Sequence, residues 1–392
     1  MAYRLTEKKL SLDLYTAFFT ARKHKTTKPY VKTFERKLKR NIKSLTNDLF
    51  SRTYKPEPSS CFVIERPKKR EVFAAQFRDR VVHHLYYNYT HGMFERTFIQ
   101  DTYSCIPSRG THYGAKRMEK HIRQESLNYT RPCYALQIDI RGYFMHIDRE
   151  LLLKIATDTI IKMSKHEAYD GLLWEDVIDV DFVLWLTKEI VLLNPRDNCK
   201  IVGTWYDWEG LDRNKSLFYT QEGRGLPIGN LTSQLFSNVY LNVFDQFVKR
   251  ELKCKHYGRY VDDAYIISHD KKWLLSLVPK INDFLKNELG IELHMGKLHI
   301  IDVRYGVSFL GSFVKPFRTY ISNATLKRML ASMGRLNMDD HEAVYRSVNS
   351  YLGTLKHYRT FKIRSAIFLN ERFLNVGYFN RDVTKMMMHE SL

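Results

Sequence analysis

The chain has 392 residues, 44% hydrophobic and 27% charged, a composition that excludes a low-complexity protein and allows two or three domains. Its formal net charge of +20 favours a polyanionic partner, with nucleic acid as the first candidate. Its five scattered cysteines form no CxxC pair and no apolar run approaches about 20 residues, which excludes a disulfide framework, a zinc site and a membrane span and predicts a cytoplasmic protein.

The first 50 residues are the most basic part of the chain, with 13 Lys or Arg against four Asp or Glu. Apolar residues repeat at helical spacing between residues 30 and 50, with lysine and arginine on the opposite side. This pattern predicts a basic helix. The basic side is either a contact for nucleic acid or an ordinary solvated surface.

The next segments alternate between strand and helix signals. The stretch YKPEPSSCFVIERPKKREVF at 54–73 predicts a hairpin with a basic tip, because prolines break the helix and β-rich pieces flank them. Helices are expected at 77–98 and 148–163, with Asp148 as the N-cap of the second. His83 and His84 have no Cys/His partners nearby in sequence and are interpreted as surface or packing residues of the first helix. CYALQIDI at 133–140 predicts a buried strand that runs into a carboxylate.

Beyond residue 165 the pattern is less regular. We expect the following elements: helix at 170–193, a polar aromatic hairpin or loop at 200–225, helix at 231–252, strand, turn and strand at 256–268, helix at 271–289, short strands within 290–301 and 305–316, and helix from 322 to the end. With no internal repeat, this order predicts an α+β fold with its chemistry in the centre.

Two carboxylates stand together in that centre. Asp262 and Asp263 lie in YVDDAYII between core-type strand residues, where two negative charges repel each other and are costly to desolvate. A cation would remove that cost, although an ordinary Asp-rich turn has the same sequence. Asp139 also ends an apolar strand, and the two strands can be neighbours in one sheet. Three carboxylates at a sheet end suit hard divalent ions, and a pair of such ions can activate a 3′-hydroxyl and stabilise a leaving pyrophosphate.

At this point the sequence resembles the reverse transcriptases. The similarity rests on YVDD between hydrophobic strands, on LQIDIRGYF with an aromatic residue five positions after Asp139, and on further segments in the expected order: IERPKKREVFAAQFRDRVVHHLYY, GLPIGNLTSQLFSNVYLN, GIELHMGKLHI, VSFLGSFVKP and SVNSYLGTLKHY. It implies a right-hand polymerase. The expected parts are an N-terminal basic helical extension (1–55), fingers (56–130), a palm with an antiparallel sheet (131–316, with an insertion at about 165–224) and a helical thumb (317–392).

The resemblance also implies residue roles. Asp139, Asp262 and Asp263 match the catalytic triad that holds two Mg²⁺ ions, with the Ile140 carbonyl as a further ligand. The remaining matches are in the nucleotide site and the primer grip: Lys68 or Lys69 with Arg70 on the triphosphate, Phe144 as the gate against a 2′-hydroxyl, Lys297 near the triphosphate, and Phe309, Leu310 and Gly311 on the primer.

The loop at 225–234 narrows the resemblance. Most reverse transcriptases carry Gln-Gly and Ser-Pro pairs where this chain has Ile228-Gly229 and Ser233-Gln234. That pattern is similar to the enzymes of diversity-generating retroelements, which copy a template-repeat RNA with errors at adenines for mutagenic retrohoming. The implied partners are template RNA, a primer or cDNA strand, dNTPs and a pentameric accessory variability protein in a bacterial or phage setting.

Two other interpretations remain open. One is a defence or abortive-infection reverse transcriptase, and the other is a catalytically silent RNA-binding relative. Alternative structural explanations are also open for single residues: PKKR as an exposed turn, Phe144 as a core residue, and Ile228 as a packing residue under the loop.

Overall fold

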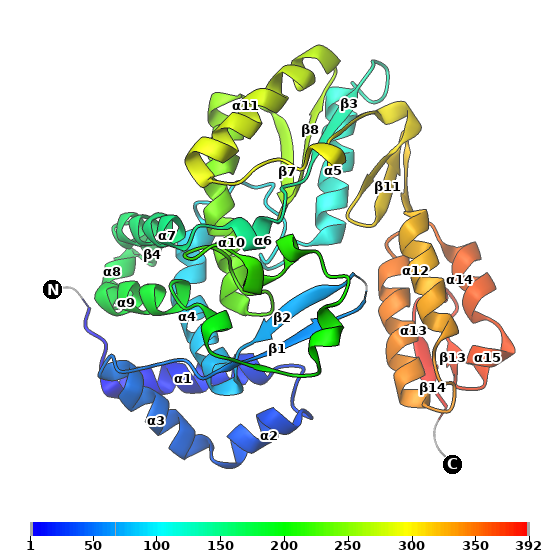
Figure 1. Ribbon diagram of the computed structural model, residues 1–392. Coiled ribbons are helices and arrows are strands. Elements are labelled where there is room, and N and C mark those ends of the chain that lie inside the picture. Colours follow the sequence, from blue (N-terminus) through cyan, green and yellow to red (C-terminus); the bar gives the residue numbers. More distant parts are fainter. Residues whose placement is uncertain (1–2, 67, 390–392) are drawn as a thin grey trace.

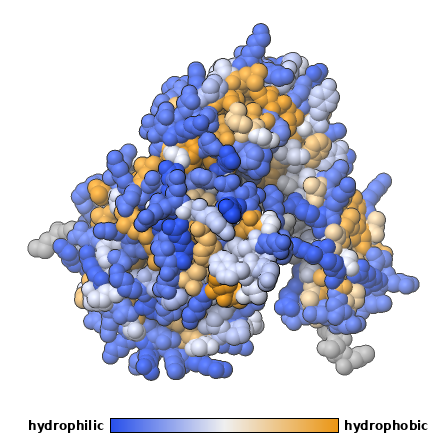
Figure 2. Space-filling model, viewed as in Figure 1, coloured by the Kyte–Doolittle hydropathy of each residue, from blue (hydrophilic) through white to orange (hydrophobic). Residues whose placement is uncertain are grey.

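The computed structural model describes residues 3–66 and 68–389. Figure 1 shows N-terminal helices and a small sheet at the lower left, a second sheet with its helices above, and a C-terminal helical unit at the right. Mixed helices and antiparallel strands in three parts confirm the expected α+β class and right-hand polymerase architecture. In Figure 2 a notch separates the C-terminal unit from the rest, with hydrophilic residues along much of its rim.

The N-terminal part consists of α1 (Glu7–Arg22), α2 (Pro29–Arg36) and α3 (Leu38–Phe50). The single helix predicted over 30–50 is wrong, because the chain breaks at Lys37. The Asn41 side chain donates to the Phe34 carbonyl at 2.9 Å, which adds to the hydrogen bond that this carbonyl accepts from the Lys37 N–H at the end of α2. The break lets the Phe34 ring pack on Phe77 while α3 buries its own apolar face against α1.

A three-stranded sheet in the order β2-β1-β6 forms the fingers core. The hairpin predicted at 54–73 is confirmed as β1 (Ser59–Ile64) and β2 (Arg70–Ala74), and β6 (Cys199–Ile201) adds to β1 in parallel. Helices α4 (Phe77–Glu95) and α5 (Thr111–Glu125) follow the hairpin. His83 of α4 is buried, and burial lowers its pKa to about 4, which fits the packing role expected for it.

The palm is a four-stranded antiparallel sheet in the order β7-β8-β3-β9. Its strands are β3 (Tyr134–Ile138), β7 (His256–Tyr260), β8 (Asp263–Ser268) and β9 (His299–Asp302), which confirms the strands predicted at 133–140 and 256–268. Alternate side chains face opposite layers. Leu136 and Ile266 join the main core, whereas Ala135 and Ile267 pack with a smaller cluster on α5 and the strands after residue 306.

Helices cover the main-core face of this sheet. They are α6 (Tyr143–His146), α7 (Arg149–Ser164), α10 (Leu231–Gln246, continued by a π-helical turn Phe247–Glu251) and α11 (Lys271–Leu289). Asp148 caps α7 as predicted, accepting from the Leu151 N–H at 3.0 Å. The strand structure predicted within 290–301 is confirmed only at its end, where β9 begins at His299. The first part of this range is not a strand, and the 3₁₀ turn Met295–Lys297 precedes β9.

The segment 165–224 divides into two parts. The first contains β4 (Glu167–Tyr169), β5 (Leu172–Leu173), α8 (Trp174–Val177) and α9 (Val180–Val191), and α9 packs on α7 and α4. The second contains β6 and four 3₁₀ turns: η1 (Pro195–Asp197), η2 (Trp205–Trp208), η3 (Arg213–Lys215) and η4 (Leu217–Tyr219). Where the sequence predicted a hairpin or loop at 200–225, the chain forms the 3₁₀ turns η2, η3 and η4.

The C-terminal unit begins with the sheet β10 (Val307–Phe309), β11 (Ser312–Lys315) and β12 (Arg318–Ile321), followed by α12 (Asn323–Gly334), α13 (His341–Leu355), α14 (Phe361–Phe368) and α15 (Glu371–Leu374). The helices α12 to α15 share an apolar core of their own with Ile321 of β12, whereas Val307, Phe309 and Val314 of β10 and β11 pack with α5 and the sheet that contains β3. The prediction of helix to the end is wrong for β13 (Gly377–Phe379) and β14 (Met386–Met388). The Asn380 side chain accepts from two backbone N–H groups in the connecting turn, a local pattern that helical periodicity does not reveal.

No helix within residues 3–66 and 68–389 combines the length and apolar character that a membrane span requires.

Candidate active site

Three carboxylates meet at one end of the palm sheet. Asp139 directly follows β3, Asp262 lies in the turn between β7 and β8, and Asp263 begins β8. Ile138 pairs with Ala264, so the antiparallel register brings Asp139 beside Asp263 on neighbouring strands. Strand pairing alone thus brings together Asp139 and Asp263, which are 124 positions apart in sequence.

The environment of these carboxylates disfavours their ionisation. Burial, followed by the charge of Asp139, raises the pKa of Asp262. Burial, followed by the charges of Asp262 and Asp139, raises the pKa of Asp263 to about 6. The Asp263 side chain itself is exposed to solvent. The desolvation that raises its pKa therefore comes from the many protein atoms around the site, and no other element of the described chain covers the side chain. The three groups repel one another, and a bound cation would relieve that repulsion.

A lysine ammonium already faces one of them. Lys297 Nζ lies 3.0 and 2.9 Å from the two carboxylate oxygens of Asp139, and the backbone carbonyl of Asp139 accepts from the His294 N–H at 2.8 Å. The ammonium stands where positive charge is needed, and its side chain is half exposed and long enough to move aside.

The donor set fits a hard divalent ion. Carboxylate oxygens and a backbone carbonyl are the ligands that Mg²⁺ accepts. Ile140 lies opposite Leu293 in an isolated antiparallel bridge. The two hydrogen bonds of this bridge are accepted by the Asp139 carbonyl and donated by the Arg141 N–H, so the bridge does not use the Ile140 carbonyl. In the described part of the chain, no three His, Cys, Asp or Glu side chains lie close enough together to form a preformed metal site. The fit therefore rests on the chemistry and mutual repulsion of the donors.

A buried ion pair supports the turn that carries Asp262. Arg259 and Asp245 are both fully buried, and Arg259 donates to the two Asp245 oxygens at 2.7 and 2.6 Å. A third N–H of Arg259 donates at 2.9 Å to the carbonyl of Val261, whose φ of 55° is unusual for a β-branched residue. Sequence reasoning missed this pair. The signals in the sequence were Arg259 within a strand and Asp245 among the apolar residues of a helix.

The basic tip of the fingers hairpin lies close to the carboxylates. Lys68 and Arg70 are exposed, and their charges reach Asp263 and Asp262 respectively, where they offset part of the repulsion. Lys69 is engaged elsewhere, because its ammonium donates to the carbonyl of Glu209 at 2.6 Å. The sequence left two lysines open, and in this structure Lys68 is the one whose charge faces the site.

The loop before α10 is attached to the fingers. The Ile228 carbonyl accepts from the Phe73 N–H of β2 at 2.9 Å. Gly229 has a φ of 124°, and a Cβ there would lie 2.8 Å from Val72 Cγ1. A side chain at this position would therefore collide with strand β2, and glycine lets the loop lie against that strand.

Ile228 and Phe144 belong to one apolar cluster. Both are half-buried and pack around Phe73, and the Phe144 carbonyl accepts from the Leu226 N–H at 2.8 Å. Gln234 is separate from this cluster. It lies exposed in the first turn of α10, where its side-chain oxygen accepts from the Cys105 thiol at 3.4 Å. The two unusual residues of this loop thus occupy different surroundings.

The proposed primer-grip residues form the tight turn between β10 and β11. Phe309 is buried, with its ring 5.0 Å from that of Tyr265. Leu310 and Gly311 have φ values of 50° and 83°. A Cβ on Gly311 would lie 3.1 Å from Thr325 Oγ1, so the neighbour that this glycine accommodates is α12 of the thumb. Phe309 is a core residue, and the backbone of the turn is what remains available to a strand.

A second feature that the sequence did not reveal is Glu71, next to Arg70. It is fully buried and accepts three hydrogen bonds: from Trp208 Nε1 at 2.6 Å, from the Ser216 hydroxyl at 2.7 Å and from the Leu217 N–H at 2.6 Å. The segment 199–219, here called the strap, is thereby fastened to the fingers hairpin by β6 on one side and by Glu71 on the other.

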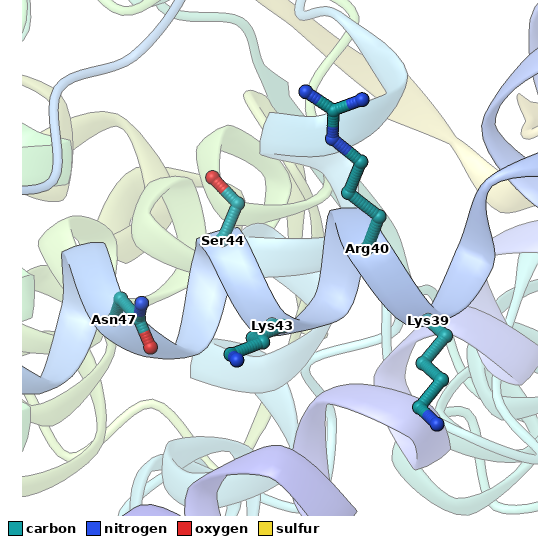
Figure 3. Close-up of a pocket in the computed structure, with 5 residues that line it drawn as sticks. All are labelled: Lys39, Arg40, Lys43, Ser44 and Asn47. Carbon is teal, nitrogen blue, oxygen red and sulfur yellow. The ribbon is translucent and has the colours of Figure 1, made fainter.

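Positive side chains also gather far from the carboxylates. A surface hollow runs along α3, lined by Lys39, Arg40, Lys43, Ser44 and Asn47. Figure 3 shows Arg40 and Lys39 pointing to opposite sides of this helix. All the lining residues come from one helix, so the hollow is an open basic surface, not an enclosed site.

Comparison with known proteins agrees with this geometry. A sequence model described as reverse transcriptase (RNA-dependent DNA polymerase) matches residues 66–314, which include strand β2 with its basic residues, the three carboxylates and the β10–β11 turn. The chain belongs to the reverse transcriptase family. Its enzyme class is that of the RNA-directed DNA polymerases.

Individual relatives are distant. The Escherichia coli (strain K12) protein YkfC is 23% identical over 308 residues, which cover 69% of this chain and 70% of YkfC. Among solved structures, apo telomerase of Candida tropicalis, truncated from the C-terminal domain, matches with a TM-score of 0.45 and 12% identity over 71% of this chain. Candida albicans telomerase in complex with a telomeric RNA fragment matches with a TM-score of 0.47 and 10% identity over 80% of this chain. The chain spans 59% and 55% of those two telomerase chains.

Proposed function

We propose that this chain copies a template-repeat RNA into cDNA by two-metal nucleotidyl transfer. The observation that carries the proposal is the meeting of Asp139, Asp262 and Asp263 at one sheet end, with the charges of Lys68 and Arg70 directed at them. The carboxylates repel one another, and the cations of the hairpin face them. Such a site suits a triphosphate that binds together with divalent ions, because the ions pair with the carboxylates and the phosphates pair with the cations.

The chain's own residues divide the work. Asp139, Asp262 and the Ile140 carbonyl would hold the ions, with Asp263 as their neighbour. Ions held there would supply activation of a 3′-hydroxyl and neutralise charge on the pyrophosphate. Arg70 pairs with phosphate oxygens through its planar fork, and Lys68 adds a point charge. Lys297 is half exposed and flexible, so its ammonium could turn from Asp139 to the triphosphate.

Primer extension on an RNA template tests this proposal. The wild-type chain should extend a DNA primer only when Mg²⁺ is present. Asp262→Asn should reduce the rate at least about 100-fold, because the remaining groups hold the ions poorly. Asp283→Asn, which changes an exposed carboxylate on α11, is the matched control and should extend at the wild-type rate. Extension that persists in Asp262→Asn would overturn the assignment, and a wild-type chain that binds RNA without extending would be a silent relative.

The proposed subfamily is that of diversity-generating retroelements, with errors at template adenines and a pentameric accessory partner. Its support is Ile228, where most relatives have a glutamine that can donate and accept hydrogen bonds. Ile228 packs against the same apolar cluster as Phe144, and its side chain can make no hydrogen bond to a base. Ile228→Gln should lower misincorporation opposite adenine relative to the other template bases. An unchanged error spectrum would leave Ile228 as a packing residue.

The defence interpretation shares this chemistry and differs in genomic setting. A template and variable repeat pair beside the gene supports diversification, and a locus without one supports defence.

A further inference from the structure

The strap presents large aromatic side chains to solvent. Trp205, Tyr206 and Tyr219 are 59%, 84% and 61% exposed, although side chains of this size are usually buried or in contact with a partner. In Figure 1 the strap is the green segment beside β2, on the side toward α12 and α13. The proposed catalytic chemistry uses none of these three residues.

Two of these rings, those of Trp205 and Tyr219, pack against neighbouring side chains. The ring of Trp205 lies 5.2 Å from that of Trp208 and 5.3 Å from that of Phe218. Trp208 is itself buried and bonded to Glu71. The guanidinium of Arg213 lies 5.1 Å from the centre of the Tyr219 ring. A preformed aromatic surface loses little conformational freedom when a flat partner stacks on it.

The strap also touches both parts of the candidate active site. Lys69 at the fingers tip donates to the carbonyl of Glu209. On the palm side, the carbonyl of Asn214 lies 3.1 Å from where a Cβ of Gly142 would be, three residues after Asp139. The segment that carries the exposed rings therefore contacts both the hairpin with the basic tip and the turn that follows Asp139.

We propose that the strap binds the single-stranded part of the RNA template ahead of the base being copied, by stacking bases on Trp205, Tyr206 and Tyr219. This inference rests on the proposed function. Base stacking on aromatic rings tolerates any sequence, as a template surface requires. The strap carries three basic and three acidic residues, and two of its own exposed cations, Arg213 and Lys215, serve as phosphate contacts.

Binding of primer–template duplexes with different template overhangs tests the proposal. The probes are labelled RNA–DNA duplexes whose RNA strand extends by about one or about ten nucleotides, the longer within the range of single-strand binding sites. In the double variant Trp205→Ala/Tyr206→Ala, the Kd for the long overhang should rise about 10-fold or more, while the Kd for the short overhang stays the same. Tyr206→Phe, which keeps the ring, should bind like the wild type. Tyr169→Ala removes a tyrosine of similar exposure (56%) from the first part of the insertion and should also leave both values unchanged.

The outcomes separate this inference from the proposed function. If the double variant binds both overhangs as the wild type does, or loses both equally, the strap is not a template surface, although primer extension by the wild type would still support the polymerase. If the wild type makes no cDNA but the double variant loses only long-overhang binding, the strap inference stands and the polymerase proposal falls. Loss of a protein partner with RNA binding intact would assign the rings to a protein contact and overturn the proposal.

Discussion

Removing one carboxylate from the candidate metal site should stabilise the metal-free chain. Folding raises the pKa of Asp263 from an ordinary value of 3.8 to about 6, first because of burial and then because of Asp262 and Asp139. The folded chain therefore opposes the ionised form of Asp263 at any pH above 6. This cost falls as the pH drops through 6 toward 4, where the folded chain takes up the proton. Asp263→Asn carries no charge and avoids the cost entirely.

The size of the effect follows from the same values. The difference between 3.8 and about 6 corresponds to about 3 kcal/mol at 1.36 kcal/mol for each tenfold change in proton affinity. Because the Asp263 side chain is exposed, solvent screening reduces the expected gain to about 1 kcal/mol. Urea unfolding in EDTA at pH 8 should thus show Asp263→Asn more stable than the wild type by about that amount, with the gain shrinking at acid pH.

Mg²⁺ supplies the second half of this test. A ligand that binds only the folded chain raises the free energy of unfolding, so Mg²⁺ should stabilise the wild type more than Asp263→Asn and narrow the difference between them. Asp283→Asn, on the exposed side of α11, should change neither stability nor its response to Mg²⁺. If Asp263→Asn matches this control at pH 8, or if its gain is the same at pH 5, the carboxylates do not repel one another as described.

Three further substitutions have defined outcomes. Arg259→Gln leaves Asp245 buried without its partner and should lower the free energy of unfolding by about 3 to 5 kcal/mol in urea; a loss below about 1 kcal/mol would contradict the role of this pair. Glu71→Gln places an amide NH₂ group against either the Leu217 N–H or the Trp208 Nε1–H, because each of these donors bonds a different oxygen of Glu71. The strap should lose about 1 to 3 kcal/mol of local stability, seen as faster amide exchange there while the palm strands stay protected; equal acceleration in both would count against a separate strap. Phe144→Ala should raise ribonucleotide over deoxyribonucleotide incorporation by about 10-fold in single-nucleotide extension; an unchanged ratio would leave Phe144 as a core residue.

The palm was predictable because its signals are local. An apolar strand that runs into Asp139, and a two-strand pattern around Asp262 and Asp263, give both the elements and the place where their ends meet. The cap of α7 at Asp148 was equally local. For the candidate site, this identified the carboxylates and the basic hairpin tip as a group.

The features that the sequence did not reveal depend on contacts between distant segments. The sequence around Gly229 does not show that Val72 lies beside this glycine, because the two residues meet only in the folded chain. Glu71 looks like one more charge beside a basic tip, because its three donors come from about 140 residues later in the chain. The break at Lys37 depends on where the Phe34 ring packs, which periodicity along a helix cannot show.

The parallel pairing of β6 with β1 has a consequence for the order in which the chain can fold during synthesis. Ser59 pairs with Cys199, so one edge of the fingers sheet stays open while the following residues leave the ribosome, and Glu71 waits for Leu217. The palm strand β3 and helices α4 to α7 are made within that interval. Contacts between such distant residues form slowly, and unpaired strand edges favour association between chains. Nascent chains halted before residue 199 should therefore have fingers more accessible to protease than chains halted after residue 220.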